Sequence, residues 1–243
     1  MISNNTKVGI IIQARMGSTR LPAKIMMLIN NKPILKYQIE RLSVLGYPLV
    51  IATTTGTQDD IIEEFALANE LLCFRGDEDD VLKRYYDCAD NHNLHTVVRL
   101  TSDCPLIDAE LINEGISRFL LENNENLYLS NTLERTYPRG ADFEIFSFLL
   151  LKQAHENAAK QSEREHVTPY IWNNDLVKVI QIKHNQDHSK YRLTLDTQED
   201  FDLIKILIEE FKADKLNIAQ ICDIMVNHPA LHKINQHIEQ KKI

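Results

Sequence analysis

The sequence contains few of the residues that mark disulfide-rich, metal-finger or membrane proteins. Its 243 residues include four cysteines, Cys73, Cys88, Cys104 and Cys222, with no C-x-x-C pair or metal-finger spacing among them. We therefore expect reduced, mostly buried thiols. No apolar run approaches the ~20 residues that a membrane-spanning helix needs, and no signal-peptide pattern precedes the first apolar segment. These absences predict a cytoplasmic protein without a membrane partner.

An excess of basic charge is also missing. The chain has 27 lysines and arginines against 35 aspartates and glutamates, a formal net charge of -8. Proteins that bind nucleic acids in general neutralise phosphates with a basic face, so we expect no nucleic-acid partner. A hydrophobic content of 44% over this length is enough for one globular α/β domain with an appendage.

Apolar segments that read as strands alternate with helical patterns along most of the chain. We expect strands near residues 8–12, 49–53, 70–74, 95–100, 127–130, 141–146, 176–182 and 191–195, with helices between most of them. This alternation predicts an α/β fold, a Rossmann-like and mostly parallel sheet with helices on both faces. The main domain is expected over residues 7–211, with 123–146 as a small arm and 212–243 as a C-terminal helical extension.

A cationic loop follows the first predicted strand. Residues 10–24 read I-I-I-Q-A-R-M-G-S-T-R-L-P-A-K. The loop combines fixed cations with flexible backbone and hydroxyl groups, at Arg15, Gly17, Ser18, Thr19, Arg20 and Lys24. Such donors suit a polyanion such as a triphosphate, and ligands of open α/β sheets bind at the carboxyl ends of strands. The alternative is a solvated, positively charged loop.

Two aspartates occupy similar places after later predicted strands. Asp103 follows the strand at 95–100, and Asp196 follows the strand at 191–195. Carboxylates beside a triphosphate are the ligands that Mg²⁺ prefers, because it takes one or two protein carboxylates together with phosphates. The alternatives are a helix N-cap for Asp196 and a turn residue for Asp103.

Alternation in A-D-F-E-I-F at residues 141–146 predicts that Asp142 and Glu144 share one face of a strand. A solvated sheet edge is the alternative for these two carboxylates. The acidic run at residues 77–80 is interpreted as a charge cluster at a helix start and not as a second metal site.

Five segments together resemble one enzyme family. They are R-x-G-S-T-R-L-P-x-K at 15–24, R-G-D-E-D-D-V-L-K-R-Y at 75–85, R-L-T-S-D-C-P-L-I-D at 99–108, E-R-E-H-V-T-P-Y-I at 163–171 and Y-R-L-T-L-D-T-Q-E-D-F at 191–201. Over roughly residues 7–211 the chain resembles the SpsF-like branch of the cytidylyltransferases, which is similar to the CMP-sialic acid and CMP-Kdo synthetases.

The resemblance implies a nucleotidyltransferase fold of the GT-A-like type that uses CTP and Mg²⁺ to activate a sugar and releases pyrophosphate. It implies that Arg15, Gly17, Ser18, Arg20 and Lys24 bind the triphosphate and that Thr53, Arg75 and Arg99 lie near the cytidine. Asp103 and Asp196 would hold the metal. Nucleotidyl transfer depends on positioning and on neutralising phosphoryl charge, which assigns catalytic roles to Arg15, Lys24 and Asp103.

The acceptor side is less defined. Our hypothesis places Asp142, Glu144, Arg164, Glu165 and His166 there, with a sugar or sugar phosphate as acceptor and an acidic or amino sugar favoured. His166 has a structural role as its alternative, and a general base is needed only if the acceptor is a hydroxyl. The family's loop usually has Gly at the position of Ala23, which lacks glycine's freedom for positive φ.

The resemblance also implies a homodimer, with the arm at 123–146 as a candidate contact. Two other functions stay open. A nucleotide-sugar glycosyltransferase would carry a D-x-D metal motif, and S-D-C-P at residues 102–105 lacks its second Asp. A non-catalytic nucleotide-binding partner is the other alternative, although Arg15, Lys24, Asp103 and Asp196 are all present.

Overall fold

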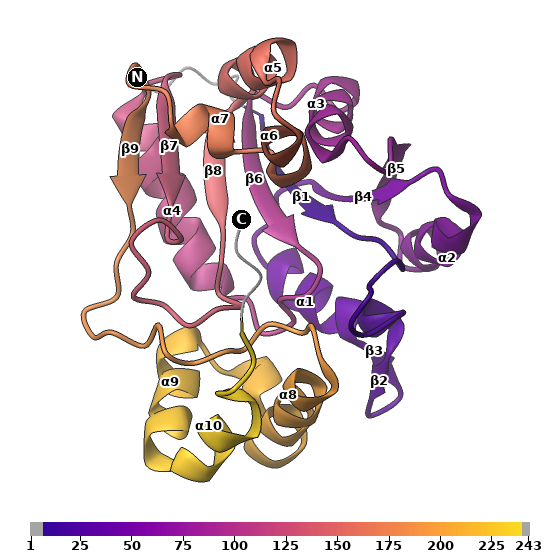
Figure 1. Ribbon diagram of the computed structural model, residues 1–243, viewed down its shortest axis with the longest axis vertical. Helices are drawn as coiled ribbons and strands as arrows, with labels where there is room; N and C mark the ends of the chain where they lie inside the picture. Colours follow the sequence, from indigo (N-terminus) through magenta and orange to yellow (C-terminus); the bar gives the residue numbers. More distant parts are fainter. Residues whose placement is uncertain (1–6, 240–243) are drawn as a thin grey trace.

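The computed structural model describes residues 7–239, which form a seven-stranded sheet in the order β5-β4-β1-β6-β8-β7-β9 (Figure 1). The strands of this sheet are β1 Val8–Gln13, β4 Leu49–Thr54, β5 Leu72–Gly76, β6 Thr96–Thr101, β7 Leu127–Ser130, β8 Glu144–Ser147 and β9 Lys178–Gln181. A small hairpin of β2 Leu28–Ile29 and β3 Lys32–Pro33 stands apart. Strands β5, β4, β1 and β6 are parallel, whereas β8 runs antiparallel to β6 and β7. The predicted α/β fold with a mostly parallel sheet is confirmed.

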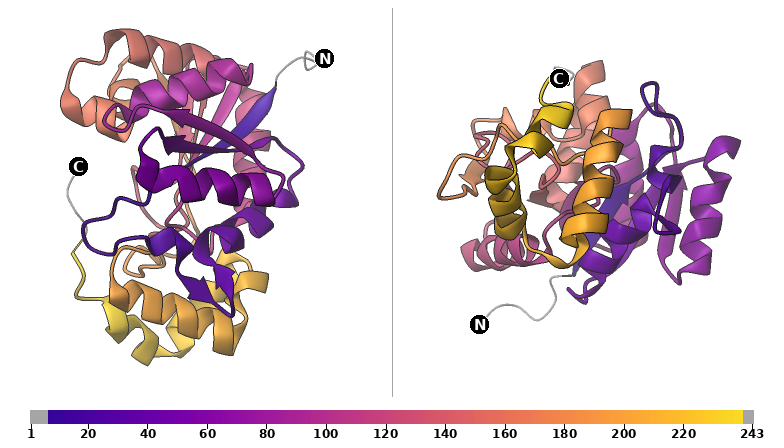
Figure 2. Two further views of the ribbon diagram at one scale, coloured as in Figure 1. Left: turned by 90° about the vertical axis from the view of Figure 1, so that its right-hand side faces the viewer. Right: turned by 90° about the horizontal axis from the view of Figure 1, so that it is seen from below.

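Helices cover both faces of the sheet (Figure 2). They are α1 Ile34–Ser43, α2 Asp60–Ala68, α3 Val81–Asn91, α4 Ala109–Glu122, α5 Phe148–Asn157, α6 Gln161–His166, α7 Pro169–Trp172, α8 Gln198–Phe211, α9 Ile218–Asn227 and α10 Pro229–Asn235, with short 3-10 turns at Lys24–Met26, Thr57–Asp59 and Ala213–Lys215. One hydrophobic core joins α1, α2, α4 and α8 to the sheet, and a second joins α3, α5 and α7 to its other face. No helix among residues 7–239 is both long and apolar enough to cross a bilayer.

The C-terminal helices gather beyond one end of the sheet (Figure 1). Helix α10 packs on α8 and α9, and Asn235 of α10 is fully buried. Helices α9 and α10 lie within the predicted C-terminal extension at 212–243, whose last four residues lie outside the described range.

Two local predictions are wrong. Residues 191–195 do not form a strand, because their backbone makes an isolated bridge between Arg192 and Arg139 and then bonds to the turn after β6. Asp142 does not share a strand with Glu144, since β8 begins at Glu144. Phe143 and Ile145 do pack into the same core.

Candidate active site

The loop at residues 14–24 is fixed at its start by a buried carboxylate. The backbone amide of Met16 donates to Asp59 Oδ1 at 2.6 Å, and the Thr54 hydroxyl donates to the other oxygen. Further along, the amide of Ala23 donates to the carbonyl of Met16 at 3.2 Å. Asp59 thus positions the loop from β4 and the turn after it. The sequence analysis did not single out Asp59, because its partners Met16 and Thr54 are brought to it only by the fold.

Ala23 adopts the backbone conformation that its side chain disfavours. Its φ is 58° and its ψ 18°, in the left-handed region. An L-residue pays about 1–2 kcal/mol for this conformation. The expectation that alanine would avoid a positive φ here is corrected. The loop keeps this turn directly before Lys24, because its other contacts outweigh the strain.

Lys24 joins the two predicted metal-binding carboxylates. Its Nζ donates to Asp103 Oδ2 at 3.1 Å and to Asp196 Oδ1 at 2.7 Å. Asp196 Oδ2 also lies 3.0 Å from Arg20 Nη2 and 2.7 Å from Arg192 Nη2. These five residues form a charge cluster at the carboxyl ends of β1 and β6. The sequence predicted four of them, and Arg192 is an addition.

The ionised state of this cluster follows from the pairing. Burial alone would lower the pKa of Lys24, but Asp103 and Asp196 raise it above its usual value. Burial alone would raise the pKa of Asp196, but Lys24, Arg20 and Arg192 hold it below its usual value. Lys24 and Asp196 are therefore both charged at neutral pH.

Backbone contacts bring Asp196 to Asp103 without a strand. The amide of Leu195 donates to the Asp103 carbonyl at 2.8 Å, and the Thr194 hydroxyl reaches the same carbonyl at 3.2 Å. The Asp103 carboxylate is itself oriented by the Thr101 hydroxyl, which donates to Oδ1 at 2.6 Å. Two distant segments of chain thereby present their carboxylates to one lysine.

A buried carboxylate of α8 supports the cluster from behind. Asp200, fully buried, accepts from Arg192 Nε at 2.8 Å and from the amide of Asp196 at 2.9 Å. The Asn235 side chain of α10 donates to Asp200 Oδ1 at 2.9 Å and to the Arg192 carbonyl at 3.0 Å. The C-terminal helices therefore help to hold Asp196 in place. T-L-D-T-Q-E-D-F contains Asp200, but only the fold shows its role.

The donor set of the cluster suits a metal that arrives with phosphates. Among residues 7–239, no group of three or more His, Cys, Asp or Glu side chains is placed to hold a metal. Mg²⁺ needs only one or two protein carboxylates when phosphates and waters complete its octahedron. Asp103 and Asp196 supply two such carboxylates, and they lie close together because both contact Lys24 Nζ.

The remaining predicted nucleotide residues have different surroundings. Arg15 and Gly17 are exposed on the loop, and the Ser18 hydroxyl accepts from the amide of Leu21 at 3.3 Å. Thr53 is fully buried, and its hydroxyl has no hydrogen-bond partner among the described residues. Arg84, which sequence reasoning did not single out, is buried close enough to Arg15 for that charge to lower its pKa further below what burial causes.

Arg75 and Arg99 are engaged within the protein. Arg75 Nη1 lies 2.7 Å from Asp60 and 2.8 Å from Glu63, and its other nitrogens donate to carbonyls of the β4 end. Arg99 forms an ion pair with Glu144. Neither contacts the cluster around Lys24. These pairs give both arginines structural contacts, which depend on tertiary neighbours that the sequence does not reveal.

The structure does not bring the predicted acceptor residues together. Asp142 pairs with Arg135, and Arg164 pairs with Asp80, the N-cap of α3. Glu144 is buried, and its carboxylate accepts from Arg99, Tyr128 and Thr168. Glu165 is exposed and His166 is half-buried at the end of α6. Asp142, Glu144 and Arg164 therefore belong to three separate internal pairs.

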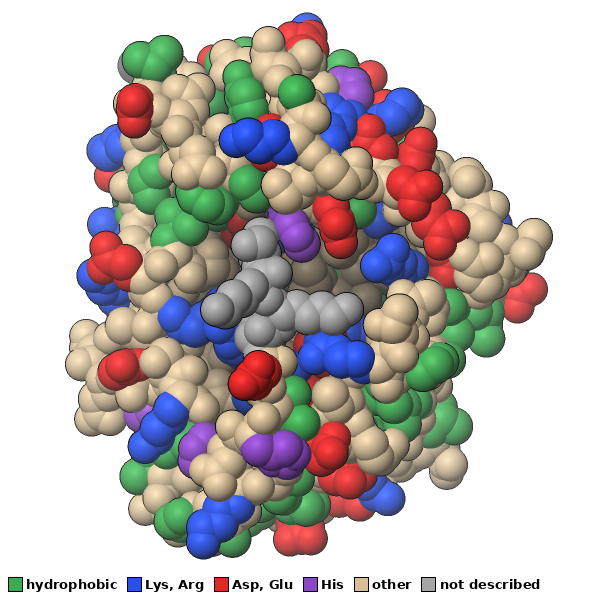
Figure 3. Space-filling model, in the orientation of Figure 1, with side chains coloured by type: hydrophobic (Ala, Val, Ile, Leu, Met, Phe, Trp, Pro, Cys, Tyr) green, Lys and Arg blue, Asp and Glu red, His purple; other side chains and the backbone are tan. Residues whose placement is uncertain are grey.

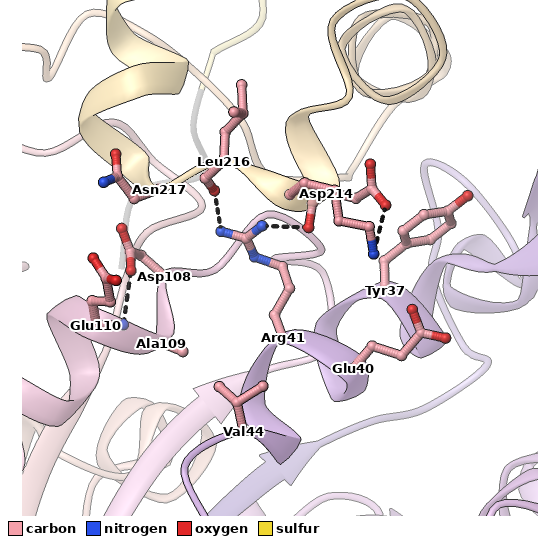
Figure 4. A pocket seen from close by; sticks show the side chains of 11 residues that line it. Tyr37, Glu40, Arg41, Val44, Asp108, Ala109, Glu110, Asp214, Leu216 and Asn217 are labelled. Carbon is pink, nitrogen blue, oxygen red and sulfur yellow. Dashed lines mark hydrogen bonds and ion pairs between the residues drawn. The ribbon is translucent and has the colours of Figure 1, made fainter.

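Two cavities lie near the C-terminal helices. One, of about 260 Å³, lies between α1, the start of α4 and residues 214–217 (Figure 4). There Arg41 donates to the carbonyls of Asp214 and Leu216 at 2.8 and 2.7 Å, which ties α1 to the C-terminal segment. None of the charge cluster lines it.

The other cavity, of about 200 Å³, adjoins the cluster. Arg139, Lys190, Arg192 and Asn235 are among the residues that line it. Burial lowers the pKa of Arg139, Arg135 and Arg192 lower it further, and Asp142 raises it. Three of the side chains that line this cavity, Arg139, Lys190 and Arg192, are therefore cationic. Lys and Arg side chains also lie on both sides of the centre of the face drawn in Figure 3.

Comparisons with known proteins identify the family and support the fold. A cytidylyltransferase from Leptospira borgpetersenii superposes with a TM-score of 0.89 at 37% identity, covering 98% of this chain and 100% of that one. The spore coat polysaccharide biosynthesis protein SpsF of Bacillus subtilis is 32% identical over 82% of this chain and 85% of its own length. A CMP:2-keto-3-deoxy-manno-octonic acid synthetase complexed with CTP shares the fold, with a TM-score of 0.64 at 15% identity over 85% of this chain and all of that one. A family model described as cytidylyltransferase matches residues 9–236, and the chain belongs to this family of nucleotidyltransferases.

Proposed function

We propose that this cytidylyltransferase transfers CMP from CTP to a sugar acceptor and releases pyrophosphate, in the synthesis of a surface polysaccharide. The observation that carries the proposal is the position of Lys24, which contacts Asp103 and Asp196 at the end of the cationic loop. The similarity to SpsF, a spore coat polysaccharide biosynthesis protein, supports the biological context.

In the proposed reaction an acceptor oxygen attacks the α-phosphorus in line and pyrophosphate leaves. Arg15, Arg20 and Lys24 neutralise charge on the triphosphate, and the backbone around Gly17 and Ser18 supplies further donors. Asp103 and Asp196 would hold Mg²⁺, which would supply further positive charge to the phosphoryl oxygens. Lys24 then exchanges its carboxylate contacts for phosphate contacts, so its charge is available where negative charge develops.

The acceptor in this proposal carries an anionic group, as an acidic sugar or a sugar phosphate does. The cavity lined by Arg139, Lys190 and Arg192 supports it, because it places positive charge next to Asp196. Arg139 takes the acceptor-side role that Arg164 does not have, since Arg164 is bound to Asp80. A phosphate or phosphonate acceptor needs no general base.

We also propose that the protein works in the cytoplasm as a homodimer. Part of the segment at 123–146 is the candidate contact, and Leu133 within it is a large hydrophobic residue left exposed. Light scattering at micromolar concentration tests the assembly, and a monomer mass would contradict it.

The experiment is pyrophosphate release from CTP, UTP, ATP and GTP, each with and without Mg²⁺. The acceptor panel contains 3-deoxy-ulosonic acids, amino sugars, sugar phosphates and phosphonates. We expect release only with CTP, Mg²⁺ and an anionic acceptor. Activity with another nucleotide and none with CTP would contradict the nucleotide assignment, and preference for an uncharged sugar would contradict the acceptor class.

A further inference from the structure

The turn that joins α6 to α7 is strained at two successive residues. Val167 has φ 71° and ψ -55°, which a β-branched side chain rarely adopts. The amide of Thr168 donates to the carbonyl of His166 at 2.8 Å, so these residues form a γ-turn of the rare, strained kind. Thr168 itself has φ -100° and ψ -10°, a region disfavoured directly before a proline such as Pro169. Surrounding contacts must therefore hold this backbone.

Those contacts run through a buried carboxylate. The Thr168 hydroxyl donates to Glu144 Oε1 at 2.5 Å, and the Tyr128 hydroxyl donates to the same oxygen at 2.5 Å. Arg99 forms an ion pair with the other oxygen. Burial alone would lower the pKa of Arg99, but Glu144 raises it above its usual value, so Arg99 stays charged beside this carboxylate. The Glu144 carboxylate therefore accepts from three side chains inside the protein.

The same network reaches the strand ends that carry the charge cluster. Arg99 Nη2 donates to Gln13 Oε1 at 3.2 Å, and Gln13 is the last residue of β1, before the cationic loop. The Gln13 carbonyl accepts from the amide of Ser102 at 3.1 Å, next to Asp103. A chain of contacts therefore joins Thr168 through Glu144 and Arg99 to Gln13 at the end of β1.

We propose that Thr168 and Glu144 are positioning residues that hold the strained turn so that His166, the last residue of α6, contacts the acceptor. Strain of this kind persists only where surrounding contacts over-determine it, and it concentrates at functional sites. A turn that served only as a connection would be formed with less strain by glycine. The inference rests on the proposed transfer to an acceptor and assigns Glu144 a role that differs from direct acceptor binding.

Two hydroxyl donors to one oxygen provide a matched pair of variants. Thr168→Val and Tyr128→Phe each remove one hydrogen bond to Glu144 Oε1, but only Thr168 belongs to the turn. We measure pyrophosphate release with CTP and the acceptor panel above, CTP affinity by calorimetry, and amide exchange of the peptide covering residues 161–170.

For Thr168→Val we expect kcat/KM for the acceptor to fall at least about tenfold, with CTP affinity within about twofold of wild type, because the contact acts on the acceptor side. Amide exchange over 161–170 should become faster. Tyr128→Phe should leave kcat/KM for the acceptor and the rate of amide exchange over 161–170 within about threefold of wild type. Thr168→Ser should restore both quantities to wild-type values. Equal effects of Thr168→Val and Tyr128→Phe on both measurements would overturn the proposal. If the wild type releases no pyrophosphate with any acceptor, the proposed function fails, and amide exchange still decides whether Thr168 holds the turn.

The strain itself is tested at position 167. Val167 is fully buried, so Val167→Ala and Val167→Gly both lose packing, but only the glycine variant loses Cβ and with it the strain. We expect Val167→Gly to melt about 2–4 °C above Val167→Ala. As control, Ala158 has an ordinary φ of -67°, so Ala158→Gly should melt below wild type. A glycine variant that melts below Val167→Ala would show that the backbone is unstrained and would contradict the proposal.

Discussion

At the scale of single residues, Lys24 sets the state of the site before a nucleotide binds. Its ammonium contacts Asp103 and Asp196 together, so neither carboxylate is uncompensated. In the proposed reaction the incoming phosphates would compete with these carboxylates for Lys24, and a divalent cation would replace the charge of the lysine beside them. The two exchanges would keep the carboxylates compensated, because an unpaired carboxylate beside a triphosphate would be repelled.

Asp103→Asn tests this exchange. The substitution keeps the size of the side chain and removes its charge, so we expect pyrophosphate release with CTP and Mg²⁺ to fall about 100-fold or more. Asp87→Asn is the control, since Asp87 pairs with Lys83 on α3, away from the charge cluster. Turnover and metal dependence that survive in Asp103→Asn would show that Asp103 does not hold the metal.

Ala23→Gly tests the strain in the loop. Glycine adopts φ 58° without the steric cost that alanine bears, and we expect a gain in the free energy of unfolding of up to about 1 kcal/mol. Ala66→Gly, within the buried face of α2, should lose about 1 kcal/mol instead. Urea denaturation measures both, and a loss of stability in Ala23→Gly would show that the loop does not strain Ala23.

The sequence was sufficient to group Lys24, Asp103 and Asp196, because each lies in a motif where a polar side chain follows an apolar segment. It was not sufficient for Arg75, Arg99 and Arg164. Each of these arginines pairs with a carboxylate that comes from a different element or turn, and the neighbours of an arginine in space cannot be inferred from its spacing along the chain.

At the scale of elements, the segment after His188 shows that a wrong prediction of secondary structure can still place a site residue correctly. The run Y-R-L-T-L has the alternation of a strand, yet the amides of Leu193 and Leu195 donate to the carbonyls of Arg139 and Asp103. These long-range bonds replace a ladder, and Asp196 still reaches the charge cluster. A periodic pattern shows that a segment is extended and half-buried but does not reveal its partners.

Helix α10 is expected to stabilise the site through Asn235. Asn235→Ala removes the donor to Asp200 Oδ1 and to the Arg192 carbonyl, leaving two buried acceptors with one partner fewer. We expect a loss of about 1–3 kcal/mol in the free energy of unfolding. Gln236→Ala, at an exposed position of the same segment, is the control and should change stability by less than about 0.5 kcal/mol. A loss of equal size in both variants would contradict the supporting role of Asn235.

At the scale of the whole molecule, the alternation of strands and helices was enough to predict a mostly parallel sheet. It could not predict that β8 inserts antiparallel between β6 and β7, because the order of strands in space depends on long-range pairing. The net charge of -8 likewise describes the molecule but not the site, where cations from the loop after β1 and from the segment before α8 converge on two carboxylates.

The pH dependence of stability tests that convergence in the whole protein. The pKa of Asp196 is lowered in the folded state, so its pairing stabilises the fold above the usual carboxyl pKa and is lost as the pH falls through the lowered value. The pKa of Lys24 is raised, so its contribution is present below the usual lysine pKa and is lost only at strongly alkaline pH. Asp196→Asn should therefore cost about 1–3 kcal/mol between about pH 5 and 8, and the difference from wild type should shrink as the pH falls toward 2. Urea denaturation over this range measures it, with Asp175→Asn as a control for net charge at an exposed position. A difference that stays constant down to pH 2 would show that Asp196 is not held ionised by Lys24 and its neighbouring arginines.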